Sequence, residues 1–220
     1  MDQLLELCNN AKFAFELRAN GNHLTPLSPF SELQGKIATW QDYNFGATPA
    51  WQKAMGIAEE IFELCDAINS PSELSATERA EILDATADIA IYSLSFCTSL
   101  RVEYNVIFRL TPVPDFKPTG RIDRDLKEAA IRIGSAAKPI AHAVLKNAQG
   151  IRGFDDQIKF VSHAVLGIGS VARATELVTR LLGSDFESVV RGVAENVLKR
   201  DWRKHPVTAA AEVLNVSRKE

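Results

Sequence analysis

The apolar residues of this chain recur with the period of an α-helix along most of its length. Ile158, Val161, Val165, Ile168 and Ala172, for example, are spaced three or four residues apart. This spacing places them on one face of a helix and predicts that the face lies in a core. No sustained alternation of apolar and polar residues and no convincing hairpin turn indicates strands. The sequence therefore predicts an all-α fold, a bundle of helices.

Prolines and capping residues predict where the helices begin and end. The pair Ser70-Pro71 should stop one helix, because the residue before a proline disfavours helical geometry. Ser75 and Glu78 have the spacing of a capping box and should open the next helix. The expected helices span about residues 1–18, 31–43, 50–69, 75–100, 122–148, 155–182 and 184–203.

A proline-rich segment divides the chain into two parts. Residues 110–121 contain Pro112, Pro114, Pro118 and Gly120, which are typical of a linker. We therefore expect an N-terminal helix and connector (1–30), an acidic helical unit (31–110), a linker (111–121) and a second, basic helical unit (122–220). Comparable helices on the two sides of the linker also raise the hypothesis that the second unit is a degenerate repeat of the first.

Charge is distributed unevenly between these parts. Residues 1–116 hold 16 acidic and 7 basic residues, whereas residues 117–220 hold 12 acidic and 18 basic residues. An acidic half that could hold cations, joined to a basic half, suits a small anionic substrate. A nucleic acid partner is not expected, because duplex-binding proteins more often carry a net positive charge, and this chain carries −3.

The chain lacks the features of a membrane or secreted protein. No apolar run approaches the roughly 20 residues needed to cross a bilayer, and the first residues lack the basic start of a secretory signal. Its three cysteines, Cys8, Cys65 and Cys97, are widely spaced and form no CxxC pattern. We therefore expect a cytoplasmic protein with free thiols and no membrane partner.

Carboxylates are concentrated between Lys53 and Arg101, where nine acidic residues accompany one basic residue, Arg79. Helical spacing places the acids of each expected helix beside its apolar strip, so antiparallel packing through these strips would bring the carboxylates together at one edge of the core. Converging carboxylates repel one another unless they bind protons or a cation. Six of the nine acids form two clusters: Glu59, Glu60 and Glu63, then Glu81, Asp84 and Asp88.

Two interpretations of the clusters remain open at this point. A set of oxygen ligands without nearby Cys or His favours Mg²⁺ or Mn²⁺ over zinc. Alternatively, the clusters are simply solvated faces of helices, as surface acids usually are. A di-iron helical bundle ranks last, because its ExxH pairs are missing and no histidine occurs between His23 and His142.

The acidic segments resemble the signature of the MazG-like all-α nucleoside triphosphate pyrophosphohydrolases, which include the dimeric dUTPases. That signature is EExxE, a spacer, and ExxD leading into an apolar helix with a tyrosine four residues past the aspartate. Here Glu59-Glu60-Ile61-Phe62-Glu63 is followed by Asp84 and by Asp88-Ile89-Ala90-Ile91-Tyr92. The resemblance covers about residues 31–105 and includes the aromatic turn that ends at Gly46, with a weaker echo at 196–202.

The resemblance implies a reaction and a set of ligands. Such proteins hydrolyse a nucleoside triphosphate between its α- and β-phosphates with Mg²⁺, for which Mn²⁺ is an alternative, and we expect this chain to form a homodimer or to be internally pseudo-dimeric. By analogy, Glu60, Glu63, Asp84 and Asp88 would hold the metal, and Glu59 would orient or deprotonate the attacking water. One departure matters: the glutamate of ExxD falls at Ala85. Asp84 would substitute for it, and a catalytically weakened nucleotide- or partner-binding protein is the alternative function.

Further residues are candidates for binding the substrate. Trp40 and Phe45 would stack on the base and Asn44 would meet its edge, while Tyr92 would reach a sugar or phosphate. Each also has a structural alternative, which is filling the core for the aromatic residues and shaping the turn for Asn44. Cations from the basic half are candidates for the phosphates, although each is individually more typical of a solvated surface. They are Lys146, Lys199 and Arg200, followed by Arg152 and Lys204.

Overall fold

The computed structural model describes residues 2–20, 28–69 and 74–206, and this part of the chain is helical without a strand. The prediction of an all-α fold is therefore confirmed. The helices are α1 (Asp2–Ala19), α2 (Pro29–Phe45), α3 (Ala50–Asn69), α4 (Ala76–Leu100), α5 (Tyr104–Leu110), α6 (Ile122–Gln149), α7 (Gln157–Leu181) and α8 (Phe186–Val197). None of these helices is both long and apolar enough to cross a membrane.

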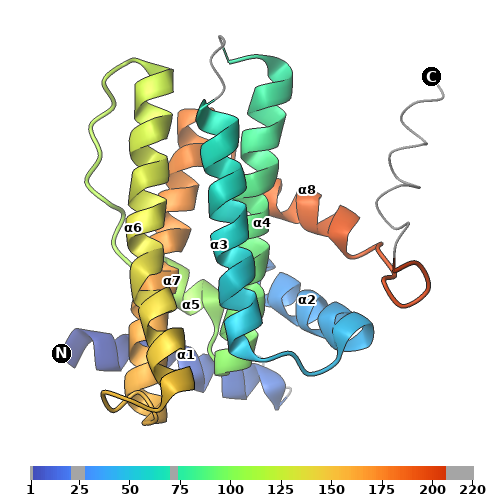
Figure 1. The fold of residues 1–220 in the computed structure, drawn as a ribbon, viewed down its shortest axis with the longest axis vertical. Coiled ribbons are helices and arrows are strands. Elements are labelled where there is room, and N and C mark those ends of the chain that lie inside the picture. The colour runs from blue at the N-terminus through green and yellow to red at the C-terminus, as the bar shows by residue number, and fades with distance from the viewer. Residues whose placement is uncertain (1, 21–27, 70–73, 207–220) are drawn as a thin grey trace.

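Four long helices form the centre of the molecule (Figure 1). α3 packs against α4 and α6, and α7 packs against the same two helices, so that each neighbour in the bundle runs antiparallel to the next. α2 and α8 pack on α4 at one side, and α1 crosses one end of the bundle beside α5 and α7. The two acidic helices of the sequence, α3 and α4, therefore lie side by side, as expected.

The buried side chains form one continuous core. It extends from Cys8 in α1 to Val197 in α8 and includes residues on both sides of the proline-rich segment. Its largest fully buried side chains include Tyr104, Phe96 and Ile133. The two helical units predicted from the sequence therefore share a core. An internal duplication stays a prediction.

The proline-rich segment runs back along the bundle. Residues 111–121 contain no helix and follow the first part of α6 toward the end of the bundle at which α6 begins, so that α6 starts far from where α5 stops (Figure 1). The buried carboxylate of Asp125 accepts hydrogen bonds from the backbone N–H (2.9 Å to Oδ1) and the hydroxyl (2.7 Å) of Thr119. Arg132 donates to the Asp115 carbonyl at 2.8 Å. These contacts hold the segment against the bundle despite its prolines.

Capping explains the start of two helices. The predicted capping box is confirmed at α4, where the Ser75 hydroxyl accepts from the Glu78 N–H and the Glu78 carboxylate accepts from the Ser75 N–H. α2 begins at Pro29, two residues before the expected position, because Ser28 is its N-cap. Proline is well suited to the first helical position, since its N–H would have no partner there.

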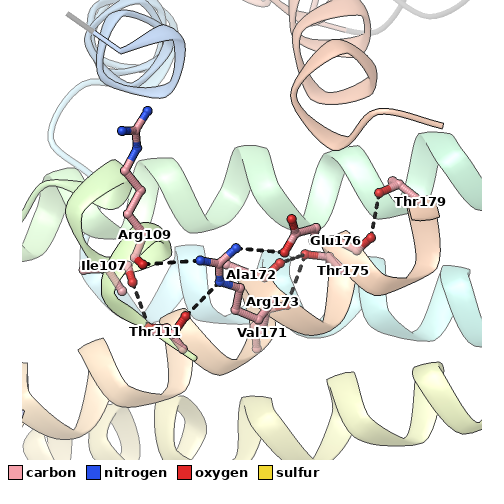
Figure 2. Close-up of polar contacts among 9 residues, drawn as sticks. All are labelled: Ile107, Arg109, Thr111, Val171, Ala172, Arg173, Thr175, Glu176 and Thr179. Carbon is pink, nitrogen blue, oxygen red and sulfur yellow. Dashed lines mark hydrogen bonds and ion pairs between the residues drawn. The ribbon is translucent and has the colours of Figure 1, made fainter. Parts of the chain in front are cut away.

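α5 was not expected from the sequence, and a contact from α7 accounts for it (Figure 2). Arg173 donates to the carbonyls of Thr111 (2.9 Å) and Arg109 (3.4 Å), which lie at the C-terminal end of α5. The same guanidinium bonds Glu176 at 2.9 Å and lies 4.1 Å from the centroid of the Phe108 ring. The carbonyls at the end of this short helix thus find a donor from a distant part of the chain.

Two details of the expected helices were wrong. Ile158, expected in the core with Val161 and Val165, is 59% exposed, because it is the second residue of α7 and lies next to the solvent-exposed loop before it. The last helix, α8, ends at Val197 rather than near residue 203. Residues 198–206 form turns instead, and they return toward α2.

Candidate functional site

A cavity of about 380 Å³ lies between α2, α3, α4 and the segment that follows α8. Aromatic rings form much of its wall, and two carboxylates and two cationic side chains contribute polar groups. It is lined by Trp40, Gln41, Phe45, Thr48, Gln52, Lys53, Glu60, Asp88, Ile91, Tyr92, Val197, Arg200 and Trp202. The second half of the chain therefore completes the cavity.

Glu60 of α3 and Asp88 of α4 are the two acids that line this cavity. Burial, together with the negative charges of Asp88, Glu63, Glu59 and Asp84, raises the pKa of Glu60 to about 8. Its Oε2 atom is buried and has no hydrogen-bond partner within the described residues. Such an orphaned oxygen is costly in a folded protein and is best explained by a ligand, a water or a proton.

Asp88 is in a similar state. Burial and the charge of Asp84 raise its pKa to about 7, although the positive charge of Arg200 acts in the opposite direction. Near neutral pH the pair Glu60 and Asp88 therefore carries less than its full negative charge. A dication in the cavity would favour the charged forms and release protons.

The other predicted acids lie outside the cavity. Glu63 and Asp84 line a separate open groove of about 450 Å³ between α3 and α4. The remaining residues of this groove are Asp66, Ala67, Glu81 and Ala85. Glu59 is exposed and lines neither space. The six clustered acids thus divide. Glu60 and Asp88 line the cavity, and Glu59, Glu63 and Asp84 act on Glu60 through their charge.

Within the described residues, no group of three His, Cys, Asp or Glu side chains is placed to hold one metal ion. Protein sites for Mg²⁺ on nucleotides, however, often use only one or two carboxylates, and waters and substrate phosphates supply the remaining ligands. The pair Glu60 and Asp88, with the orphaned oxygen of Glu60, fits that donor chemistry. Ala85 is buried beside the groove, so the family's glutamate has no equivalent there.

The aromatic wall of the cavity is built by contacts between elements. Trp40 and Phe45, from the end of α2, meet edge to face with 5.6 Å between ring centroids. The Tyr92 ring of α4 lies directly over Gly56 of α3, where a Cβ atom would collide with it. Burial and the charge of Glu60 raise the pKa of Tyr92. Trp40, Phe45 and Tyr92, all candidates from the sequence, therefore line one space.

Hydrogen bonds from α2 hold the segment after α8 over the cavity. The Trp40 indole donates to the Arg200 carbonyl at 2.8 Å, and the Trp202 N–H donates to Asn44 Oδ1 at 2.8 Å. The Asn44 amide also donates to the Trp40 carbonyl at 2.9 Å. Asn44 does not line the cavity, so its contacts match the structural alternative rather than recognition of a base edge.

Most of the predicted phosphate-binding cations do not line the cavity. Arg200 lines it and is exposed at its rim. Lys199 and Lys146 do not line it and donate to Asn196 and Gln149, respectively. Arg152 and Lys204 are also absent from the lining, and Lys204 pairs with Asp201.

Sequence reasoning missed Lys53, which is 7% exposed and lines the cavity. Its ammonium donates to the Thr48 carbonyl at 2.9 Å and to the Thr48 hydroxyl, and burial lowers its pKa. A signal was available, because Lys53 precedes Glu60 by seven residues and thus lies on the same face of α3. Gln41 and Trp202 were missed as well, although Trp202 belongs to the C-terminal segment that resembled the family.

Comparison of the chain with models of protein families, with characterised proteins and with solved structures gave no match. The resemblance to the MazG-like hydrolases therefore stays a prediction based on the residues quoted above.

Proposed function

We propose that this protein is a Mg²⁺-dependent nucleoside triphosphate pyrophosphohydrolase. The proposal depends chiefly on one observation, which is that Glu60 and Asp88 meet in an aromatic cavity where a Glu60 oxygen is buried without a partner. Aromatic walls suit a nucleobase. Uncompensated carboxylates suit a hard dication and the polyphosphate that accompanies it.

The residues of the cavity would have separate roles. Glu60 and Asp88 would hold Mg²⁺, which when bound neutralises phosphate charge and lowers the pKa of a water. Arg200 at the rim would bind the phosphates, and Trp40 and Trp202 would hold the base. The charges of Glu63 and Asp84 would strengthen cation binding from outside the cavity. A role for the exposed Glu59 in orienting the attacking water stays a prediction.

A pyrophosphate-release assay tests this function. The protein is incubated with Mg²⁺ and a panel of ribo- and deoxynucleoside triphosphates, and we expect pyrophosphate and the monophosphate from at least one of them. Glu60→Gln and Asp88→Asn should each lower kcat/KM by roughly 100-fold or more. Asp155→Asn, which removes an exposed carboxylate between α6 and α7, should leave it unchanged. Release of no pyrophosphate from any triphosphate would reject the proposal.

A second candidate function, nucleotide binding without turnover, is favoured by Ala85. This buried alanine stands where the resembling family has a metal-binding glutamate. Calorimetry that detects nucleotide binding, combined with an absence of pyrophosphate, would favour this function. Turnover that is lost in Asp84→Ala would count against it.

We also propose a homodimer in which α3 of each copy contacts α6 of the other. Trp51, Met55 and Phe62 lie within about 40° on one face of α3, and all three are exposed, Phe62 by 70%. The exposed acids Asp66 and Glu59 border one side of this face. Such a large exposed apolar strip with aromatic and methionine side chains is typical of an interface.

The outer face of α6 has the opposite charge. Ile131, 70% exposed, and Leu145 lie on its solvent-facing strip, and the basic residues Lys127 and Lys138 lie between and beside them. α3 and α6 pack side by side in one chain (Figure 1). A two-fold axis would place the acidic strip of each copy on the basic strip of the other. The same contact would then occur twice, and a symmetric dimer requires such self-complementarity.

A further inference from the structure

One neutral side chain in the cavity has a fixed orientation. Gln41 lines the cavity from α2, and its Oε1 accepts a hydrogen bond from the hydroxyl of Ser95 on α4. Ser95 is completely buried, so water does not compete for this contact. The hydroxyl has a single hydrogen, and that hydrogen is used on the Gln41 oxygen.

This contact decides which end of the amide remains for a ligand. With Oε1 bound to Ser95, the Nε2 group of Gln41 is the end with no partner among the described residues. An amide NH₂ donates hydrogen bonds and accepts none. The cavity thus presents a donor at Gln41 and disfavours a second donor opposite it.

We propose that Gln41 selects nucleobases that present a carbonyl group, rather than an amino group, to the cavity. Uracil, thymine, hypoxanthine and guanine meet this requirement, whereas cytosine and adenine carry an amino group at the corresponding position. The inference rests on the proposed function for the statement that the ligand is a nucleotide.

The neighbouring polar groups favour the same choice. Lys53 also lines the cavity and carries three N–H donors, of which the Thr48 carbonyl and hydroxyl use two. The charged acceptors of the cavity are the carboxylates of Glu60 and Asp88, which the proposed function assigns to the metal, and Thr48 and Gln52 add neutral oxygens to the lining. A base with an amino group would therefore face two donors, and one buried donor would be left unpaired, which is costly.

Matched nucleotide pairs test the selection. UMP and CMP differ in the 4-oxo or 4-amino group, and IMP and AMP differ in the 6-oxo or 6-amino group. Calorimetry with the full chain should show the oxo member of each pair binding about 10- to 100-fold more tightly. If turnover is detected, kcat/KM for UTP over CTP and for ITP over ATP should show the same preference.

Two substitutions locate the selection at Gln41. In Gln41→Glu a carboxylate replaces the donor at nearly constant shape, so the preference should reverse toward the amino members. Ser95→Ala releases the amide, which can then rotate, so the ratio within each pair should fall toward one while binding persists. Gln157→Glu, at an exposed position in α7, is the matched control and should keep the wild-type ratio.

Equal binding of the two members of each pair by the wild type would overturn the inference. It would also be overturned if Gln41→Glu, with the helix content of the wild type, kept the wild-type ratio of affinities within each pair. Because monophosphates contain no phosphoanhydride bond, their binding reports selection even when no triphosphate is hydrolysed. Hydrolysis without a preference would reject the inference alone, and preference without hydrolysis would reject the pyrophosphohydrolase alone.

Discussion

At the scale of single residues, the main feature is the pair Glu60 and Asp88. Among the described residues, neither carboxylate forms an ion pair with a neighbouring side chain, and the charged groups that act on Glu60 are acids. Arg200 is the cation that opposes this effect at Asp88. Binding of protons or of a cation would therefore reduce the repulsion between these carboxylates. As a result, the charge of the pair depends on pH near neutrality.

Glu60→Gln should change how stability depends on pH. The pKa of Glu60 is about 8 in the folded protein against an ordinary value of 4.5, so the native state binds more protons between these values. Its contribution to the free energy of unfolding is therefore fully present below about pH 4.5 and is lost as pH rises to about 8. In the glutamine variant this loss disappears, so at pH 8.5 without metal it should be more stable than wild type by about 1 kcal/mol, allowing for solvent screening.

Thermal unfolding in a chelator between pH 4.5 and 9 measures this effect. The difference in Tm between Glu60→Gln and wild type should grow with pH. Asp155→Asn is the control and should show a difference that does not depend on pH. A constant Tm difference for Glu60→Gln as well would mean that Glu60 has an ordinary pKa in the folded state.

At the scale of elements, the close approach of α3 and α4 positions the site. Gly56 lets the Tyr92 ring cross the surface of α3, and this places the ring beside Glu60. The same approach brings Asp88 to the cavity. A glycine in a helix interior costs stability in isolation, so its presence here is explained by the space that Tyr92 needs.

Gly56→Ala should therefore destabilise the protein, although alanine favours helices. The added Cβ collides with the Tyr92 ring, which must move, and we expect a loss of about 1–3 kcal/mol in the free energy of unfolding. Gly134→Ala in α6 is the matched control, because nothing lies within 4 Å of its Cβ position. It should stabilise the protein by up to about 1 kcal/mol. Urea unfolding of both variants measures the contrast, and equal effects would contradict it.

Arg173→Ala tests the contact that holds the end of α5 against α7. The guanidinium is largely buried and bonds two carbonyls and Glu176. Its removal should cost about 1–3 kcal/mol, since it leaves partly buried acceptors without a donor. Arg191→Ala breaks an exposed ion pair with Glu187 and should change stability by less than about 0.5 kcal/mol. Similar Tm values for the two variants would show that the Arg173 contacts add little.

Local signals predicted some elements and not others. The capping box at Ser75 and the proline after residue 70 lie within a few residues of the boundaries that they set, and α3 and α4 were predicted closely. α5 depends on Arg173, which is more than sixty residues away in the sequence, and no local pattern contains that contact. α8 likewise ends at Val197, just before residues 200–202, which form hydrogen bonds with the distant helix α2.

The candidate site was predicted in part for the same reason. Helical spacing placed Glu60 and Asp88 on facing helices, and the structure brings both to one cavity. Spacing could not separate them from Glu63 and Asp84, because a rotation of a few tens of degrees decides which acids face inward. Lys53 has a local signal on the face of Glu60. Trp202 and Gln41 meet the site through tertiary contacts only.

At the scale of the whole molecule, the uneven charge along the chain produces two oppositely charged strips on the surface. The acidic first part supplies α3, and the basic second part supplies α6, and these helices pack side by side. Each chain therefore carries an acidic and a basic strip with exposed apolar residues on both. The proposed dimer predicts how charge reversals on these strips should combine.

Sedimentation or light scattering at several protein concentrations tests that prediction. The wild type should be a dimer, and Phe62→Glu should shift it toward monomer. Reversal of the acidic strip (Glu59→Lys with Asp66→Lys) should weaken the dimer at low salt by placing like charges together. Adding Lys127→Glu and Lys138→Glu in the same chain should restore it. A wild-type monomer, or no restoration, would contradict this interface.

The segment that lies over the cavity is synthesised late, so the order of synthesis affects when the cavity can form. Trp40 and Asn44 emerge from the ribosome long before Arg200 and Trp202, the partners that they bind. A nascent chain that has produced α2 to α4 therefore contains both carboxylates, while the segment that covers them and the second half of the shared core are still missing. Until about residue 202 has been translated, the cavity lacks part of its wall, so we expect any ligand to bind only after most of the chain has been synthesised.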